Sequence, residues 1–248
     1  EAGRTYSQTA NIIDNSLTAP CINITAENVT FKGEGFYIES NDGFSGVYTD
    51  QFNSTISNVN ITMGVSDGGY GVEVVAGGNN CTIQNSIFTD QYYGIYLLGA
   101  NACNIKHNVV NNTQEGTDIG IYLNVNANNN TLINNSVQSD AANGIKIKTS
   151  SFEKLINNTI IGTTTNGSLV LSETNYTELI NNTATSRDGE GILLFKSSNN
   201  NNLTNNTGIS IVGQGIKING ADNNYLSNNI FTTDLGDGIL LRNASNNI

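Results

Sequence analysis

One short motif recurs along the chain at a nearly constant spacing, and this repeat constrains the fold more than any other feature. A glycine that opens a short alternating strand, such as GIYL or GILL, occurs at Gly46, Gly71, Gly94, Gly120, Gly144, Gly167, Gly191, Gly215 and Gly238. The sequence numbers of neighbouring copies differ by 25, 23, 26, 24, 23, 24, 24 and 23. Counting back from Gly46 by the first of these steps reaches Cys21, which indicates a tenth, atypical copy. A fixed period of this length is typical of stacked repeats.

A second apolar segment follows each glycine strand after a polar bend. These segments begin at Val29, Ile56, Ile83, Ile105, Leu132, Leu155, Leu179, Leu203 and Leu226. Apolar and polar residues alternate within each strand, as in strands with one buried and one wet face. Two or three strands per repeat, separated by bends of Gly, Asn, Asp and Ser, place each strand over its own copy in the next repeat.

The repeat therefore predicts an all-β chain, a single-stranded right-handed parallel β-helix of about ten coils with about 24 residues per coil. Residues 21–248 would form the solenoid, and residues 1–20 a lead-in or partial cap. Like residues of successive coils should then lie in vertical files. One predicted inner file is Val47, Val72, Ile95, Ile121, Ile145, Ile192, Ile216 and Ile239.

Pairs of asparagines mark one corner of this predicted prism, because Asn tolerates the left-handed backbone of a sharp bend. We expect a hydrogen-bonded amide ladder of Asn135, Asn158, Asn182, Asn206 and Asn229. His107 falls in the same corner and is predicted to be a structural member of the ladder, not a catalytic or metal-binding residue.

Composition excludes several classes of protein. One Pro, no Trp and only 12% charged residues argue against a helical enzyme. The formal charge of −11, with only ten Lys plus Arg, argues against a nucleic-acid partner, since phosphates need clustered cations. Apolar runs are too short for a membrane span, so we expect no membrane insertion, and Glu1 does not open a signal peptide. We therefore expect a mature secreted chain or an excised segment of a longer one.

The stacked G-I-x-[IL] strands, the [LI]-x-N-N corners and the nearly constant spacing of the copies across residues 21–248 resemble the right-handed β-helix repeats of NosD-like and carbohydrate-binding or sugar-hydrolase proteins. This resemblance implies an extracellular or cell-surface chain of the kind abundant in archaea. It does not imply one activity, because lyases, hydrolases, copper-site accessory proteins and surface-layer modules share these repeats. Copper handling is disfavoured, since the chain has one His, one Met and three Cys.

Acidic residues gather in the bends that precede the glycine strands. If the chain is an enzyme, Asp67, Asp90 and Asp118 are the candidate carboxylates, because stacking would place Asp67 and Asp90 on adjacent coils at a spacing suited to glycoside hydrolysis. Asp67, Asp90 and Asp140 are weak candidates for a calcium site, and we otherwise expect no cofactor. The alternative is a solvated acidic edge, since Asp is common in bends.

The outward file of the glycine strands reads Tyr48, Glu73, Tyr96, Tyr122, Lys146, Leu169, Leu193, Lys217 and Leu240. Tyr48, Tyr96 and Tyr122, with Tyr92 and Tyr93 in the neighbouring bend, are the candidate ligand or partner face. Tyrosines in line could stack on sugar rings. They equally suit contact with another protein, or the preference of aromatic residues for strands.

Sequons of the form N-x-[ST] are numerous, and the glycosylation candidates are Asn23, Asn60, Asn111, Asn166, Asn175 and Asn243. The sequons at Asn134, Asn157, Asn181 and Asn205 are predicted to point inward and to be by-products of the repeat.

Cys81 and Cys103 occupy equivalent sites on successive coils and are a candidate disulfide pair, although side chains stacked in register do not readily meet. Cys21 is left over, and a buried thiol is favoured there over a cross-link to a neighbouring chain.

The last coil stops at Ile248 without a cap, so we expect the rod to continue in a longer parent chain or to stack on copies of itself. The bends lack the mixed acid, base and cation set that hydrolysis or elimination demands. We therefore expect a non-enzymatic surface scaffold, a module of a sheath or filament that associates head-to-tail or side-to-side. The alternatives are a polysaccharide lyase or glycoside hydrolase, and a non-catalytic carbohydrate-binding module.

Overall fold

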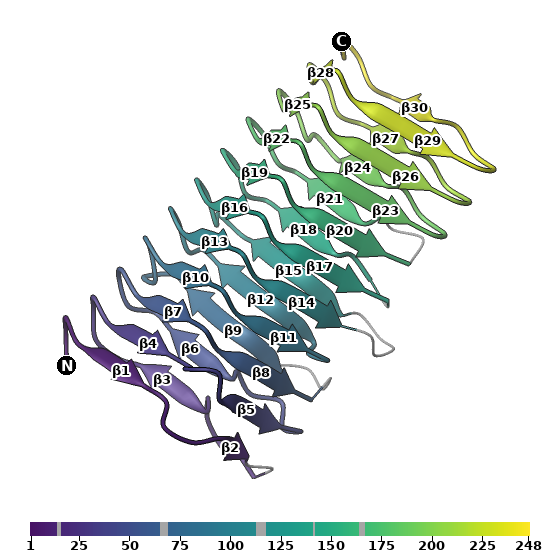
Figure 1. Cartoon of the computed structure of the whole chain (residues 1–248). Helices are drawn as coiled ribbons and strands as arrows, with labels where there is room; N and C mark the ends of the chain where they lie inside the picture. Colours follow the sequence, from purple (N-terminus) through teal and green to yellow (C-terminus); the bar gives the residue numbers. More distant parts are fainter. Residues whose placement is uncertain (14–15, 65–68, 113–117, 141, 164–166) are drawn as a thin grey trace.

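The computed structural model describes residues 1–248 except 14–15, 65–68, 113–117, 141 and 164–166, and it forms a rod of stacked coils (Figure 1). The described strands make three parallel sheets of ten strands each, which we call sheets A, B and C. Neighbours within a sheet are three strands apart in sequence, so the chain visits the three sheets in turn. The predicted all-β parallel solenoid and its coil length are confirmed.

Sheet A consists of β1 (Thr5–Ser7), β4 (Thr30–Lys32), β7 (Thr55–Ser57), β10 (Thr82–Gln84), β13 (Asn104–Lys106), β16 (Thr131–Ile133), β19 (Lys154–Ile156), β22 (Glu178–Ile180), β25 (Asn202–Thr204) and β28 (Tyr225–Ser227). Sheet B consists of β2 (Ile12–Ile13), β5 (Tyr37–Ser40), β8 (Asn60–Met63), β11 (Ile87–Thr89), β14 (Val109–Asn112), β17 (Ser136–Ser139), β20 (Thr159–Gly162), β23 (Thr183–Ser186), β26 (Thr207–Ser210) and β29 (Ile230–Thr233). Sheet C consists of β3 (Ile22–Ile24), β6 (Val47–Thr49), β9 (Tyr70–Val75), β12 (Tyr93–Leu98), β15 (Ile119–Asn124), β18 (Ile145–Lys148), β21 (Leu169–Ser172), β24 (Ile192–Phe195), β27 (Ile216–Asn219) and β30 (Ile239–Arg242).

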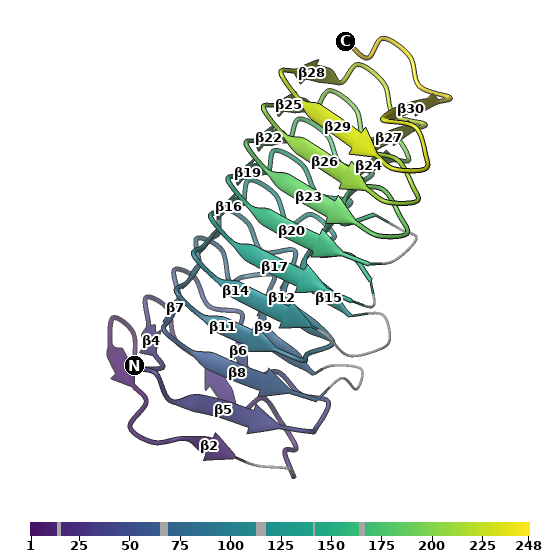
Figure 2. The ribbon, with the colours of Figure 1, turned by 45° about the vertical axis from the view of Figure 1, so that its right-hand side comes forward.

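The strands stack in register, as Figure 2 shows for sheet B along one side of the rod. Ile95 pairs with Ile121 and Ile121 with Ile145, so the predicted inner file exists. These side chains are fully buried and belong to one continuous apolar core. From the lead-in, β1 and β2 pair with β4 and β5, so residues 1–20 add strands to sheets A and B.

The asparagine corner lies between sheets A and B, where it splits the second predicted strand into two. The first asparagine of each pair takes the left-handed conformation, with φ 53° at Asn134 and 55° at Asn157. The second is buried: Asn135 donates from Nδ2 to Asn158 Oδ1 over 2.9 Å, and its backbone N–H donates to the same oxygen. Asn135 Nδ2 also donates to the Ile105 carbonyl. The predicted ladder of second asparagines is therefore present.

Three expectations about which side chains point inward were wrong. His107 is exposed and occupies the left-handed position, with φ 56°, so the ladder contact is made by the following Asn108. The first asparagines, including Asn134, also point to solvent and not inward, because a left-handed residue turns its side chain out of the corner. Leu169 points inward and Val170 takes the outward place, since Lys146 pairs with Val170.

The recurring glycines have a packing reason. At most of these glycines the backbone passes close to sheet B and to the next coil. A Cβ added at Gly120 would lie 2.6 Å from the Gly144 carbonyl oxygen and would overlap the Val137 side chain. Only glycine leaves room for this approach.

Candidate functional site

Five tyrosine rings meet on the outer face of sheet C. This tyrosine cluster consists of Tyr70 on β9, Tyr92 in the bend before β12, Tyr93 and Tyr96 on β12, and Tyr122 on β15. In-register pairing brings them together, since β12 stands between β9 and β15. The centroids of Tyr70 and Tyr93 lie 5.3 Å apart with nearly parallel planes, and those of Tyr96 and Tyr122 lie 5.5 Å apart.

The cluster is partly open to solvent. Tyr92, Tyr93 and Tyr96 are half-buried, whereas Tyr122 is only 8% exposed. The expectation that Tyr122 forms part of an open platform was therefore wrong: its ring stacks on Tyr96 and meets Tyr93 edge-on. Burial, with smaller contributions from Tyr96 and Tyr92, raises the pKa of Tyr122 to about 12. The rings of the cluster present apolar faces with hydroxyl tips.

Tyr48 stands apart from the cluster, because Glu73 pairs with Tyr48 on one side and with Tyr96 on the other. Glu73 accepts a hydrogen bond of 2.5 Å from the Ser45 hydroxyl. Burial raises the pKa of Glu73, and the Ser45 contact partly offsets this. Tyr48, Tyr70 and Glu73 line a shallow hollow. The outer face thus places one carboxyl group among the tyrosines.

A groove of about 420 Å³ follows the cluster on the same face of sheet C. We call it the lysine groove, because Lys146 and Lys148 on β18, Lys196 after β24 and Lys217 on β27 line it. Val170 and Leu193 belong to its apolar lining.

Two lysines of the groove make close contacts with neighbouring side chains. The Lys146 ammonium lies 5.5 Å from the Tyr122 ring centroid, which joins the groove to the tyrosine cluster. The Lys217 ammonium lies 2.7 Å from a Glu190 carboxylate oxygen. Burial, followed by repulsion from Lys148 and Lys196, lowers the pKa of Lys146.

Of the predicted catalytic carboxylates, Asp67 lies outside the described residues. Asp118 is 1% exposed, and its Oδ2 has no hydrogen-bond partner in the described chain. Burial first, and the negative charge of Asp90 second, raise the pKa of Asp118 to about 6. The structure therefore brings Asp90 and Asp118 within electrostatic reach of each other.

Calcium remains a prediction. Asp140 accepts from Gln138 Nε2 over 3.2 Å at the end of β17, whereas Asp90 follows β11, two strands away in sheet B. Within the described ranges, no group of three or more His, Cys, Asp or Glu side chains is arranged to hold a metal ion.

The glycosylation candidates Asn23, Asn111 and Asn243 are exposed, Asn60 and Asn175 are partly buried, and Asn166 lies outside the described residues. The four sequons of the ladder corner are exposed as well, at Asn134, Asn157, Asn181 and Asn205. Glycosylation at the five described candidates stays a prediction.

The structure joins Cys81 and Cys103 by a disulfide between successive coils, with their Cα atoms 4.4 Å apart. Both are buried in the corner between sheets C and A, whereas Cys21 is partly buried and packs against the core. The Cys103 N–H donates to Asn130 Oδ1, so the disulfide continues the file of polar ladder contacts in this corner.

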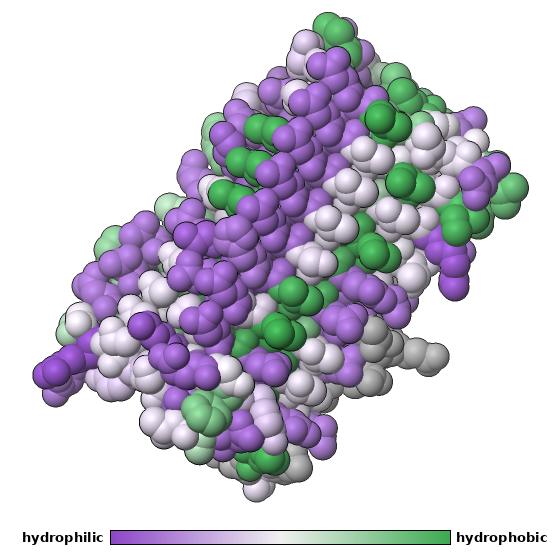
Figure 3. Space-filling view, in the orientation of Figure 1, coloured by the Kyte–Doolittle hydropathy of each residue, from purple (hydrophilic) through white to green (hydrophobic). Residues whose placement is uncertain are grey.

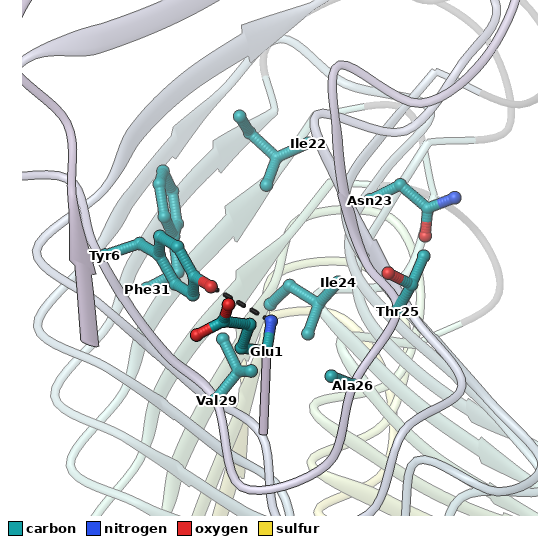
Figure 4. Close-up of a pocket in the computed structure, with 9 residues that line it drawn as sticks. All are labelled: Glu1, Tyr6, Ile22, Asn23, Ile24, Thr25, Ala26, Val29 and Phe31. Carbon is teal, nitrogen blue, oxygen red and sulfur yellow. Dashed lines mark hydrogen bonds between the residues drawn. The ribbon is translucent and has the colours of Figure 1, made fainter. Parts of the chain in front are cut away.

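A second hollow lies at the N-terminal coil (Figure 4), where Ile22 and Ile24 face Val29 and Phe31. The amino group of Glu1 donates to the Tyr6 hydroxyl over 3.0 Å beside these side chains. Ile24, Val29 and Phe31 belong to the apolar core, so this hollow is the core surface at the first coil.

Residues 45–208, more than half of the chain, match the family described as right handed beta helix region. The chain belongs to this family. Among the described residues, no α-helix is long and apolar enough to cross a membrane. Comparison with curated proteins found no match.

Among solved structures, the β-helix is similar to two Azotobacter vinelandii mannuronan C-5 epimerase modules. The AlgE4 A-module has a TM-score of 0.64 and 14% identity over 96% of this chain and 70% of its own. The AlgE6 A-module has a TM-score of 0.56 and 13% identity over 98% and 80%. A DFA-IIIase from Arthrobacter chlorophenolicus, with a TM-score of 0.50 and 13% identity over 86% and 60%, was solved with DFA-III. At these identities the likeness shows the fold.

Sequence reasoning missed the lysine groove. It placed Lys146 and Lys217 in the outward file but did not consider Lys148 and Lys196. The alternation in IKIK was a usable signal, because two lysines separated by one residue on a strand share one face of the sheet. Lys196 follows β24 in a left-handed bend, so strand periodicity does not place it. In this β-helix only the stacked coils bring it to the groove.

Proposed function

We propose that this β-helix binds a polysaccharide along the outer face of sheet C. The tyrosine cluster carries the proposal, since it brings five rings into contact on three neighbouring strands and leaves Tyr92, Tyr93 and Tyr96 half-buried. Aromatic rings stack on the apolar faces of sugars, while phenol hydroxyls bond to sugar hydroxyls or water.

The geometry of the rod suits a linear polymer. Strands of sheet C repeat along the axis at about 4.8 Å, so a chain lying along the rod meets a related surface at each coil. The similar mannuronan C-5 epimerase modules are, by name, proteins that act on a polysaccharide, which supports this class of ligand.

Affinity electrophoresis in gels containing dissolved polysaccharides tests the proposal. We expect Tyr96→Ala to weaken retention by about threefold to tenfold, the loss of one stacking contact. Tyr225→Ala, which removes an exposed ring from sheet A, is the matched control and should change nothing. Unchanged binding by Tyr96→Ala, or an equal loss in both variants, would contradict the proposal.

Catalysis on the bound glycan is a second candidate, and Asp118 favours it. A carboxyl with a pKa of about 6 keeps its proton to a higher pH than an ordinary Asp and can act as a general acid in mildly acidic solution. An enzyme should release reducing ends or unsaturated products from a polysaccharide, and Asp118→Asn should abolish this while Asp140→Asn retains it. Absence of product from glycans that the protein binds would leave a non-catalytic carbohydrate-binding module.

The extracellular scaffold is a third candidate, favoured by the outer face of sheet B. From β8 to β29 its sixteen outward positions carry no charged residue: Asn60, Thr62, Ile87, Thr89, Val109, Asn111, Ser136, Gln138, Thr159, Ile161, Thr183, Thr185, Thr207, Ile209, Ile230 and Thr232. Figure 3 shows this weakly polar surface beside the hydrophilic band of the asparagine corner. Copies with a net charge of −11 could approach each other here with least repulsion.

A further inference from the structure

We infer that the lysine groove is an anion-binding subsite and that the polysaccharide bound on sheet C is anionic, carrying carboxylates on its sugar rings. This inference rests on the proposed polysaccharide-binding function of sheet C. It adds the chemical class of the ligand and the residues that select it.

The first argument is continuity with the tyrosine cluster. Lys146 is the next residue after Tyr122 in the outward file, and its ammonium lies 5.5 Å from the Tyr122 ring centroid. A polymer stacked on Tyr96 and continuing along the rod therefore passes directly over Lys146. From β18 to β27 the groove extends for three coil steps, roughly 14 Å.

The second argument is charge. Four of the seven lysines of the chain line this groove, although the whole chain carries −11. Lys217 is neutralised by Glu190, but Lys146, Lys148 and Lys196 form no ion pair with any residue that the structure describes. Positive charges gathered this closely repel each other, and this repulsion adds to burial, the larger cause, in lowering the pKa of Lys146. A bound anion would relieve this repulsion.

The third argument is the combination of surfaces. Val170 and Leu193 are outward residues of β21 and β24, between the lysines of β18 and β27. A sugar ring offers an apolar face to such a floor and its carboxylate to ammonium groups at the side. This mixture fits an acidic sugar better than a free inorganic anion, which has no apolar face.

Single-stranded nucleic acid is the competing macromolecule, because bases also stack on tyrosines. It is disfavoured here, since its denser phosphate charge needs more cations than four lysines on a chain of net charge −11. An oligothymidylate therefore belongs in the test as a competitor, and tighter binding of it than of the polysaccharide would overturn the inference.

The decisive experiment compares a polyuronate with the same polymer after carboxyl reduction, using Lys146→Gln/Lys148→Gln. Loss of two charge-assisted contacts should weaken polyuronate binding by about tenfold or more and flatten its salt dependence. Binding of the neutral, reduced polymer should not change. Lys106→Gln/Lys154→Gln, which removes the same charge from sheet A, is the matched control and should bind both polymers normally.

The outcomes separate the inference from the function on which it rests. If both polymers bind equally and Tyr96→Ala alone weakens them, sheet C binds glycans but the anionic subsite is wrong. If neither polymer binds, both proposals fall. A sulfated polymer that binds as tightly as the polyuronate would overturn the assignment of carboxylates, because the groove would then recognise negative charge alone. Lys196→Gln, at an exposed bend after β24, repeats the test with a third lysine of the groove.

Discussion

Glu153 is the most unusual residue of the interior. It lies in the corner between sheets C and A, in the file of Cys103, Asn130 and Thr177, where most coils place an uncharged side chain. Its Oε2 accepts from the Asn130 N–H over 2.7 Å, while Oε1 is buried without a partner in the described chain. Burial raises the pKa of Glu153 to about 9, partly offset by the Asn130 contacts, so the side chain is a neutral acid at pH 7.

This raised pKa predicts a pH dependence of stability. The folded chain holds a proton that the unfolded chain releases above its ordinary pKa of 4.5. The contribution of Glu153 to stability is therefore fully present below that value and is lost as the pH rises to about 9. Glu153→Gln, which is always neutral, should match the wild type at pH 4 and exceed its free energy of unfolding by several kcal/mol at pH 9.

Urea unfolding from pH 4 to pH 9 measures this difference. Glu178→Gln, at a half-exposed residue of β22, is the control and should leave the pH profile unchanged. A constant difference between Glu153→Gln and the wild type across that range would refute a neutral buried acid.

At the scale of the strand, the asparagine corner links each coil to the next. The Asn158 Oδ1 accepts from the backbone and side chain of Asn135, and its Nδ2 donates to the Leu132 carbonyl over 3.0 Å. These bonds satisfy polar groups that sharp bends would otherwise leave buried without partners. The ladder therefore stabilises the chain by avoiding desolvated groups as much as by its own bonds.

Two neighbouring substitutions in this corner should have different effects on stability. Asn158→Ala leaves buried groups of Asn135 and Leu132 unpaired and should lower the free energy of unfolding by about 2–5 kcal/mol. Asn157→Gly, one residue earlier at an exposed position with φ 55°, should be neutral or stabilising, because glycine adopts this conformation without strain. Urea unfolding of both variants decides this, and similar losses would contradict the division between turn residue and ladder residue.

At the scale of the whole molecule, the three sheets present different chemistry. Sheet C carries the tyrosine cluster and the lysine groove, whereas sheet B is free of charge at its outward positions from β8 to β29. A scaffold would use sheet B for contact between copies and leave sheet C open to a glycan. The candidates for function can therefore coexist on one rod.

Side-to-side association predicts a specific effect of charge on sheet B. The wild type should form dimers or larger particles, and Thr183→Glu/Thr185→Glu should hold it monomeric, because like charges would then face each other. Thr131→Glu/Thr204→Glu changes sheet A by the same charge and should still associate. Sedimentation velocity and electron microscopy measure this, and a wild type that stays monomeric at high concentration would rule the interface out.

The repeat alone determined the architecture of this protein. A nearly constant period with alternating strands folds so that equivalent residues of successive coils stack. The inner file and the ladder of second asparagines were therefore predictable. The outward tyrosines on sheet C followed from the same alternation. Each of these features depends on the position of a residue within its coil, and that position can be counted from the sequence.

The direction and burial of several side chains could not be counted from the sequence. Backbone geometry and contact between coils decided them. A left-handed first asparagine turns Asn134 outward, and an offset of one residue in the Gly167 repeat exchanges Leu169 for Val170. Tyr122 becomes buried because its neighbours' rings lie over it, and Lys196 reaches the groove from a bend. Side-chain burial and charge clustering depend on several coils at once, so only the folded rod reveals them.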